Sequence, residues 1–251
     1  MALNINRHDR FTTKPSAIIF DTDNTLYPYE YPHTMATKAV EDKAVKLLDV
    51  DRKTFSDCFD TARQSVKQQL KSTASSHSRL LYFQKTVEAL GLKTQVLLTL
   101  DLEQTYWRTF LSHTQLFPGI RELILSVRRN DINTAVVTDL TAQIQFRKLS
   151  YFGLDDGFDF VVTSEEAGED KPGRDPFELA LLKLGVAPSA CWMIGDNPSA
   201  DIAGASALGI TSIQKRHDGV VVYDGKAGPD MIIDSFEDLH TELVSWGWID
   251  K

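Results

Sequence analysis

Four groups of polar side chains, rich in carboxylates, each come after a predicted strand of this chain. They are Asp21-Thr22-Asp23-Asn24-Thr25, Thr138 with Asp139, Lys171 with Pro172, and Gly195-Asp196 with Asp201. An apolar run closed by turn residues, such as residues 17–20 before the first group, is typical of a buried strand in a parallel sheet. Ligands of open α/β sheets bind beyond the carboxyl ends of the strands. The pattern therefore predicts that at least three carboxylates and one ammonium converge at one sheet edge.

This excess of carboxylates predicts a bound metal ion. Like charges held close together in a medium of low dielectric repel strongly, and a divalent cation would relieve that repulsion. Ligand sets made only of oxygen atoms suit magnesium. We therefore expect Mg²⁺ as the cofactor.

The four groups resemble, in order and spacing, the motifs of the haloacid dehalogenase-like hydrolases. Residues 20–26 are similar to the first motif, Asp-x-Asp-x-Thr after a buried strand, and Val136-Val137-Thr138 is similar to the second. Lys171-Pro172 resembles the third motif, and residues 195–201 resemble the fourth, Gly-Asp with a second Asp further on. The resemblance covers nearly the whole chain and implies a phosphohydrolase.

The resemblance also implies a role for each matching residue. Asp21 would be the nucleophile that forms an aspartyl-phosphate, and Asp23 would act as general acid and base. The Asp21 carboxylate, the Asp23 backbone carbonyl and Asp196 would hold Mg²⁺. Phosphate would be bound by Thr138 and by backbone N–H groups near Asp23 and Asp139, and Lys171 would offset the charge on Asp21 and the phosphate. Asp201 would orient Lys171 or a metal-bound water.

Two positions depart from the motifs of the family. Asn24 stands where glycine is common, and Asp139 stands where asparagine is common. Both are small residues that tolerate turn conformations, so we expect them to tune the site without abolishing it.

The remaining sequence predicts the elements that would position these residues. From Phe117 onward, helical and strand patterns alternate, which predicts a parallel sheet with helices on its faces. Between about Pro32 and His113 the apolar spacing is helical throughout, as in the run from Phe55 to Leu70. We therefore expect an α/β, doubly wound Rossmann-like core formed by residues 1–26 and 117–251. An all-helical domain, residues 27–116, would be inserted in it and is similar to the type-1 cap of the family.

The helical insert differs in charge from the rest of the chain. It holds 12 Lys and Arg against 10 Asp and Glu, whereas the remainder holds 15 against 25. This difference is either ordinary scatter on solvated faces or a supply of cations for an anionic substrate. His77 and Arg79 either contact substrate or lie in a solvated loop. The cluster of Tyr27, Tyr29 and Tyr31 either lines the substrate entrance or packs at the hinge.

The composition of the chain excludes several classes of partner. A formal net charge of −8 argues against nucleic-acid binding. Apolar runs stay well short of a membrane span, and the N-terminus lacks the apolar core of a signal peptide. Two cysteines in apolar contexts suggest neither a disulfide framework nor a zinc site. We therefore expect a cytoplasmic protein.

Taken with the resemblance, these features favour a phosphatase for a small phosphorylated metabolite, such as a sugar phosphate or nucleoside monophosphate. A haloacid dehalogenase is an alternative, but that reaction needs no leaving-group acid and no metal, so Asp23 speaks against it. A phosphomutase and a non-catalytic protein that binds a phosphorylated ligand are further alternatives. Residues 217–228 interrupt the alternation of strands and helices, and Val220 to Tyr223 with Asp224-Gly225 is compatible with a small hairpin.

Overall fold

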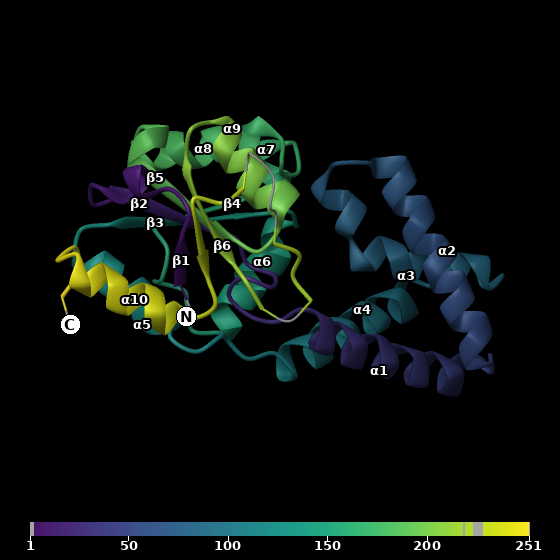
Figure 1. Cartoon of the computed structure of the whole chain (residues 1–251). Coiled ribbons are helices and arrows are strands. Elements are labelled where there is room, and N and C mark those ends of the chain that lie inside the picture. The colour runs from purple at the N-terminus through teal and green to yellow at the C-terminus, as the bar shows by residue number, and fades with distance from the viewer. Residues whose placement is uncertain (1–2, 218, 223–227, 251) are drawn as a thin grey trace. The chain divides into compact units, whose positions relative to one another are not determined.

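The computed structural model describes residues 3–217, 219–222 and 228–250 (Figure 1). The chain forms two compact units, Met1–Pro28 with Gln115–Lys251, and Tyr29–Thr114. These boundaries lie two residues from those expected from the sequence. The assignment of the two units as a catalytic core and its cap stays a prediction.

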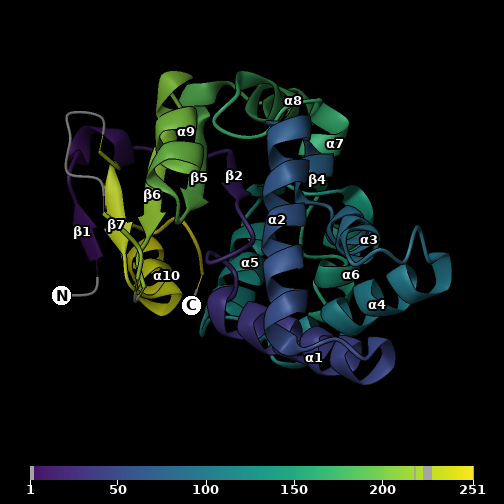
Figure 2. The same cartoon turned by 90° about the vertical axis from the view of Figure 1, so that its right-hand side faces the viewer.

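The first unit is built on a seven-stranded sheet with the order β1-β7-β6-β5-β2-β3-β4. Its strands are β1 (Leu3–Ile5), β2 (Ala17–Phe20), β3 (Asn133–Thr138), β4 (Phe160–Thr163), β5 (Cys191–Gly195), β6 (Thr211–Lys215) and β7 (Met231–Ile233). All neighbours pair in parallel except β1 with β7. The expected α/β fold is confirmed, with the addition of the antiparallel edge strand β1, which Figure 2 shows beside β7. At three residues, β1 is too short to give a pattern in the sequence.

Helices cover both faces of this sheet. They are α5 (Ile120–Arg129), α6 (Ala142–Tyr151), α7 (Ser164–Ala167), α8 (Arg174–Leu184), α9 (Gly204–Ala207) and α10 (Phe236–Ser245), with the short helices η1 (His8–Phe11), η3 (Pro188–Ala190) and η4 (Pro198–Ala203). Figure 1 shows α7, α8 and α9 on one face and α5 and α10 on the other. Because both faces are covered, the neighbouring strands β2 and β5 lack charged and amide side chains, and every residue of both strands is buried.

One predicted helix of this unit has a different form. The sequence suggested a single helix over residues 201–208, but a π-helix, η4, precedes the one-turn helix α9. The side chain of Asn197 caps η4 by accepting hydrogen bonds from the backbone N–H groups of Ser199 and Ala200, both at 2.9 Å. This cap starts the helix early and sets the position of Asp201.

The second unit consists of helices, as expected, and all of its residues are described. They form α1 (Glu30–Leu48), α2 (Arg52–Leu70), η2 (Ala74–His77), α3 (Arg79–Ala89) and α4 (Val96–Ser112). Helix α1 begins well before the predicted start at Val40, with Pro32 in its first turn. Proline is tolerated there because the first N–H groups of a helix have no partner within it.

Two further expectations concern the rest of the chain. The possible hairpin at Val220–Gly225 lies partly outside the described residues, and the described residues 219–222 form no strand. Among the described residues, no helix is long and apolar enough to cross a membrane. A cytoplasmic location stays a prediction.

Candidate active site

The central strand of the sheet places Asp21 where the order of the strands reverses. From β2 the chain continues to β3 and β4 on one side, whereas β5, β6 and β7 lie on the other side. Phe20 is in register with Ile194 of β5 and Val136 of β3, so these three strands end close together. Such a switch point is the usual ligand site of an open α/β sheet.

Lys171 joins two carboxylates at this edge. Its ammonium donates hydrogen bonds to Asp21 Oδ1 and Asp201 Oδ1, both at 2.7 Å, and to the carbonyl of Val137 at 3.0 Å. The other oxygen of Asp21 accepts a hydrogen bond from the Thr25 hydroxyl at 3.0 Å. The Asp21 carboxylate is therefore held at both oxygens in a site from which bulk water is largely excluded.

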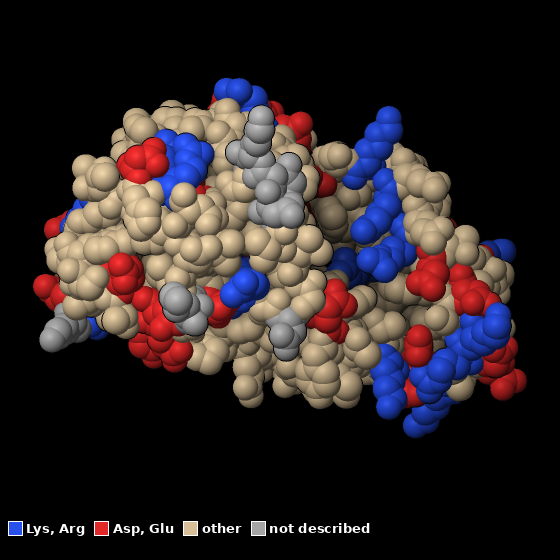
Figure 3. Space-filling view, in the orientation of Figure 1, with Lys and Arg blue, Asp and Glu red and all other residues tan. Residues whose placement is uncertain are grey.

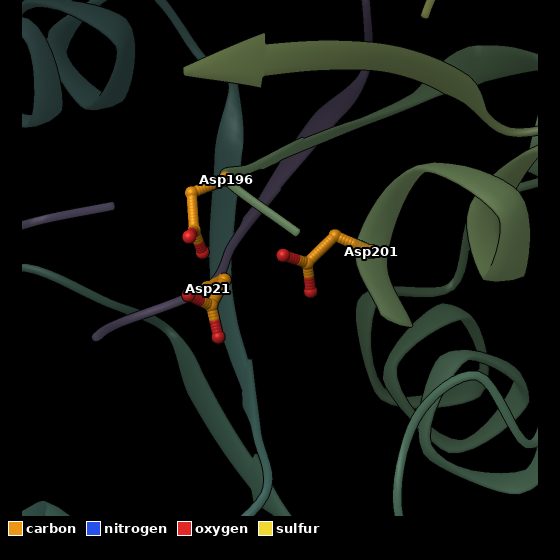
Figure 4. A group of neighbouring side chains, drawn as sticks. All are labelled: Asp21, Asp196 and Asp201. Carbon is orange, nitrogen blue, oxygen red and sulfur yellow. The ribbon is translucent and has the colours of Figure 1, made fainter. Parts of the chain in front are cut away.

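Asp196 adds a third carboxylate to this group. Figure 4 shows Asp21, Asp196 and Asp201 directed toward one another, and one oxygen of each lies within 4.8 Å of the others. Burial, followed by the charges of Asp21 and Asp201, raises the pKa of Asp196 from 3.8 to about 8. Burial is also the main cause that raises the pKa of Asp21 to about 6, against the opposing effect of Lys171. The positive charge of the Lys171 ammonium therefore does not balance the negative charge that three ionised carboxylates would carry.

This arrangement fits a divalent metal ion. The donors are carboxylate oxygens, which magnesium prefers, and their raised pKa values reflect negative charge that a cation would compensate. Asp21, Asp196 and Asp201 have the side chains that would hold it. Asp201 was expected only in support, and its carboxylate also accepts a hydrogen bond from the backbone N–H of Asn197 at 3.0 Å.

The residues expected to bind phosphate lie beside this group. Thr138, at the end of β3, shares a hydrogen bond of 3.0 Å with the Thr22 hydroxyl and accepts one of 2.6 Å from the Gln145 side chain. Because Thr138 accepts the hydrogen bond from Gln145, its own hydroxyl hydrogen can point toward another acceptor. Asp139 accepts a hydrogen bond from the backbone N–H of Lys171 at 2.8 Å. Its side chain therefore fixes the backbone that carries Lys171.

Asp23 has its own set of partners. Its Oδ1 atom accepts hydrogen bonds from the Tyr27 hydroxyl at 2.6 Å and from the Lys148 ammonium at 2.8 Å. The Lys148 side chain comes from α6, is 1% exposed, and lies 5.5 Å from the centre of the Tyr27 ring. Both bonds use Oδ1, so together they fix the direction of the Asp23 carboxylate. Tyr27 is buried and donates its hydroxyl hydrogen bond to Asp23, so Tyr27 lies inside the first unit.

With the site described, the chain can be compared with known proteins. The family model for haloacid dehalogenase-like hydrolases matches residues 18–215, which is most of the chain. The chain belongs to the haloacid dehalogenase-like hydrolases. It is 36% identical over 199 residues to the ribulose-1,5-bisphosphate 5-phosphatase of Halopiger xanaduensis, covering 79% of this chain and 83% of that protein. The glyceraldehyde 3-phosphate phosphatase of Methanopyrus kandleri is 26% identical over 200 residues, which cover 80% and 83% of the two chains.

Solved structures agree on the fold of this haloacid dehalogenase-like hydrolase. A crystal structure of 2-haloacid dehalogenase from Pseudomonas syringae pv. Tomato DC3000 matches with a TM-score of 0.75 and covers 92% of this chain and 98% of its own. At 23% identity, this likeness concerns the fold alone. The curated relatives are phosphatases, and the chain is an enzyme of this phosphatase group.

The two departures from the family motifs have local explanations in this hydrolase. Asn24 has a φ of 63°, in the left-handed region that asparagine tolerates better than most residues. Asp139 uses its carboxylate to hold the backbone N–H of Lys171, as described above. By contrast, Gly195 follows the motif for a steric reason. A Cβ atom at that position would lie 2.4 Å from the Asp201 carboxyl group, so the close approach of Asp201 requires glycine.

Sequence reasoning missed Lys148 and Gln145, which both come from α6. The residue pattern predicts a helix over Ala142–Tyr151, which are the bounds of α6, but it gives no role to the polar residues on the buried face of that helix. Ile144, Gln145, Lys148 and Leu149 are its buried residues, at the spacing of one helical face. Two polar residues on an otherwise apolar face were therefore the available signal.

Proposed function

We propose that this protein is a magnesium-dependent phosphohydrolase that acts on a small phosphorylated metabolite through an aspartyl-phosphate on Asp21. The observation that carries the proposal is the group of three carboxylates around Lys171 at the switch point of the sheet. A nucleophilic carboxylate must be ionised and fixed in direction, and the bonds from Lys171 and Thr25 favour both conditions for Asp21.

In the first step, an Asp21 oxygen attacks phosphorus while the bond from phosphorus to the leaving oxygen breaks. The leaving oxygen takes a proton from Asp23, which lies two residues further along the same turn. Tyr27 and Lys148 hold Oδ1 of Asp23 and thereby orient its carboxyl group for this transfer. Thr138 donates a hydrogen bond to a phosphoryl oxygen, and the positive charge of the nearby Lys171 ammonium offsets the negative charge on Asp21 and the phosphoryl group.

In the second step, water attacks phosphorus of the aspartyl-phosphate. Asp23, now ionised, takes a proton from the attacking water, and the bond between phosphorus and Asp21 breaks. Inorganic phosphate leaves, and both carboxyl groups return to their starting states. Mg²⁺, held by Asp21, Asp196 and the residues around them, would supply charge compensation for the phosphoryl oxygens in both steps.

The substrate class follows from the relatives and from the charge of the helical unit. The two relatives described above are named for a sugar bisphosphate and a triose phosphate. We therefore propose a phosphorylated sugar or a related small metabolite as substrate, with nucleoside monophosphates as the next class to examine. The role of the helical unit as a cap that limits substrate size is part of this proposal.

Purified protein should hydrolyse p-nitrophenyl phosphate in Mg²⁺ and lose this activity after exhaustive chelation. A panel with ribulose 1,5-bisphosphate, glyceraldehyde 3-phosphate and nucleoside monophosphates, scored by phosphate release, would then identify the substrate class. Absence of phosphate release from every compound would refute the proposal. Dehalogenation of a 2-haloacid that persists after chelation would replace it with the alternative reaction.

A further inference from the structure

The helical unit contains a long stretch of basic sequence without acidic residues. Between Asp60 and Glu88 there are five basic residues, Arg63, Lys67, Lys71, Arg79 and Lys85, and no Asp or Glu. Figure 3 shows Lys and Arg side chains gathered over α2 and α3 of this unit. Elsewhere in the same unit, acidic and basic residues are interspersed along the sequence, and some of them pair, as Arg52 does with Glu41 at 2.8 Å. The basic stretch therefore differs from the ordinary surface of its own unit.

Arg79, the first residue of α3, lies among aromatic rings. The centre of its guanidinium group is 5.3 Å from the Tyr106 ring, 5.5 Å from the Tyr82 ring and 5.7 Å from the Trp107 ring. These three rings are almost fully buried, whereas Arg79 is half-buried. The sequence left open a solvated loop at this position, but the guanidinium group instead covers the aromatic core of the unit.

The hydrogen bonds of Arg79 go to neutral acceptors. Its guanidinium donates to the His77 carbonyl at 2.8 Å and to the Tyr29 hydroxyl. Tyr29 is thereby placed in the helical unit, where its ring also stacks on His33. No carboxylate forms an ion pair with Arg79 among residues 3–217, 219–222 and 228–250.

Aromatic rings and hydroxyl groups stabilise a cation without cancelling its charge. Ring faces attract a guanidinium group through their quadrupoles, and the net charge of the group stays positive. Arginine does not lose its proton in proteins, so it cannot escape the cost of partial burial by becoming neutral. The helical unit thus keeps positive charge at a half-buried, rigid position without its own counter-ion.

We propose that Arg79 forms an oxyanion-binding site of the helical unit, which takes a phosphate or carboxylate group. A planar guanidinium held against aromatic rings presents its N–H groups in a fixed direction, which favours paired hydrogen bonds to such an anion. The anion is either a second anionic group of the substrate or a free anion that binds the unit. The first source rests on the proposed phosphatase function, and the second does not.

Sulfate binding tests the site independently of any enzyme activity. The probe is inorganic sulfate, and the signal is tryptophan fluorescence, because Trp107 is the tryptophan of the helical unit and the other three belong to the first unit. Saturable quenching that disappears in Trp107→Phe would assign the signal to the helical unit. Arg79→Gln should weaken sulfate binding about tenfold or more, because it removes hydrogen bonds that the charge of the guanidinium group strengthens.

Two further variants show whether weaker sulfate binding comes from loss of the Arg79 site or only from loss of one positive charge. Arg108→Gln removes an exposed arginine of the same unit and should bind sulfate like the wild type. Arg79→Lys keeps the charge but loses the planar group, so its affinity should lie between those of wild type and Arg79→Gln. Unchanged sulfate binding in both Arg79 variants, or no saturable Trp107 signal in the wild type, would overturn the proposal.

Kinetics then distinguish the two sources of the anion. The ratio of KM for ribulose 1,5-bisphosphate to KM for p-nitrophenyl phosphate is measured in wild type, Arg79→Gln and Arg108→Gln. A rise of about tenfold in this ratio for Arg79→Gln alone supports the site and assigns it to a second anionic group of the substrate. Lost sulfate binding with an unchanged ratio supports the site and assigns it to a free anion. If the wild type hydrolyses neither compound, the proposed function fails while the sulfate result still decides the site.

Discussion

Asp21 and Asp23 lie two residues apart, but their surroundings differ in charge. Around Asp21, three carboxylates share the single ammonium of Lys171. Around Asp23, one carboxylate is matched by the ammonium of Lys148 and by a phenol hydroxyl. The first region carries excess negative charge, whereas the ammonium of Lys148 balances the charge of Asp23.

This difference indicates which part of the site depends on a ligand. The region of Asp21 would be complete only with an added cation, in agreement with the raised pKa values of Asp21 and Asp196. The region of Asp23 has a cation supplied by the chain itself. We therefore expect metal dependence to arise from the first region and leaving-group dependence from the second.

The largest effect is expected for Asp21→Asn. The amide is nearly isosteric but is a poor nucleophile and a weaker metal ligand, so turnover should fall below detection while the fold is retained. Phosphate release and thermal unfolding would be measured together. Asp175→Asn, an exposed substitution of the same type on α8, is the control and should keep full activity. Activity above a few per cent in Asp21→Asn would contradict the assigned nucleophile.

Asp23→Asn should show a smaller loss that depends on the leaving group. A general acid and base contributes about 10²–10⁴-fold, and the acid matters least for a good leaving group such as nitrophenolate. Alkyl phosphates should therefore react far more slowly than in the wild type. With nitrophenyl phosphate, rapid-quench measurements should show a burst of nitrophenol and then accumulation of phosphoenzyme on Asp21. An equal loss of the first step for both substrates, without a burst, would reduce Asp23 to holding the metal or shaping the turn.

Lys148→Met should act through Asp23 and cause a loss of about tenfold in kcat for alkyl phosphates, with KM little changed. Without its ammonium partner, the Asp23 carboxylate loses the bond that orients it. Lys183→Met is the matched control, because Lys183 pairs with Glu166 at 2.6 Å outside the site.

A double-mutant cycle tests whether Lys148 works through Asp23. If it does, adding Lys148→Met to Asp23→Asn should cost little further activity, because the two residues act as a unit. Fully additive losses would instead assign Lys148 a purely structural role in α6.

Sequence order predicted the first of these regions better than the second. Asp21, Lys171 and Asp196 follow strands of one parallel sheet, and the rule that such strands end at one edge predicts their convergence from sequence alone. Lys148 follows no strand. Its position depends on how α6 packs against the sheet, and that packing is a tertiary property.

The elements show the same limit. Long periodic segments such as α2 and α6 were recognised from their apolar spacing, which local sequence determines. The three-residue strand β1 was not recognised, because its pairing with β7 joins residues more than two hundred positions apart. The basic character of the helical unit was visible in the sequence, but the aromatic surroundings of Arg79 were not. They combine Tyr82 of α3, Tyr106 and Trp107 of α4, and Tyr29 just before α1, which only the packing of these helices brings together.

The smallest expected effect concerns stability, and it isolates the excess charge around Asp21. The pKa of Asp196 is raised from 3.8 to about 8, so between these values the folded, metal-free protein binds more protons than the unfolded chain. Its stability therefore falls as pH rises through that window, and Asp21 contributes in the same direction up to a pH of about 6.

Mg²⁺ competes with these protons, so it should bind more tightly at pH 8 than at pH 6. Thermal unfolding with Mg²⁺ and with chelator should show a rise in Tm of a few degrees that is larger at pH 8. Asp196→Asn should lose most of this rise, whereas Asp175→Asn should retain it. Equal Mg²⁺-induced rises at the two pH values in the wild type would mean that the charge around Asp21 is already compensated without a metal, and the contrast between the two regions would then disappear.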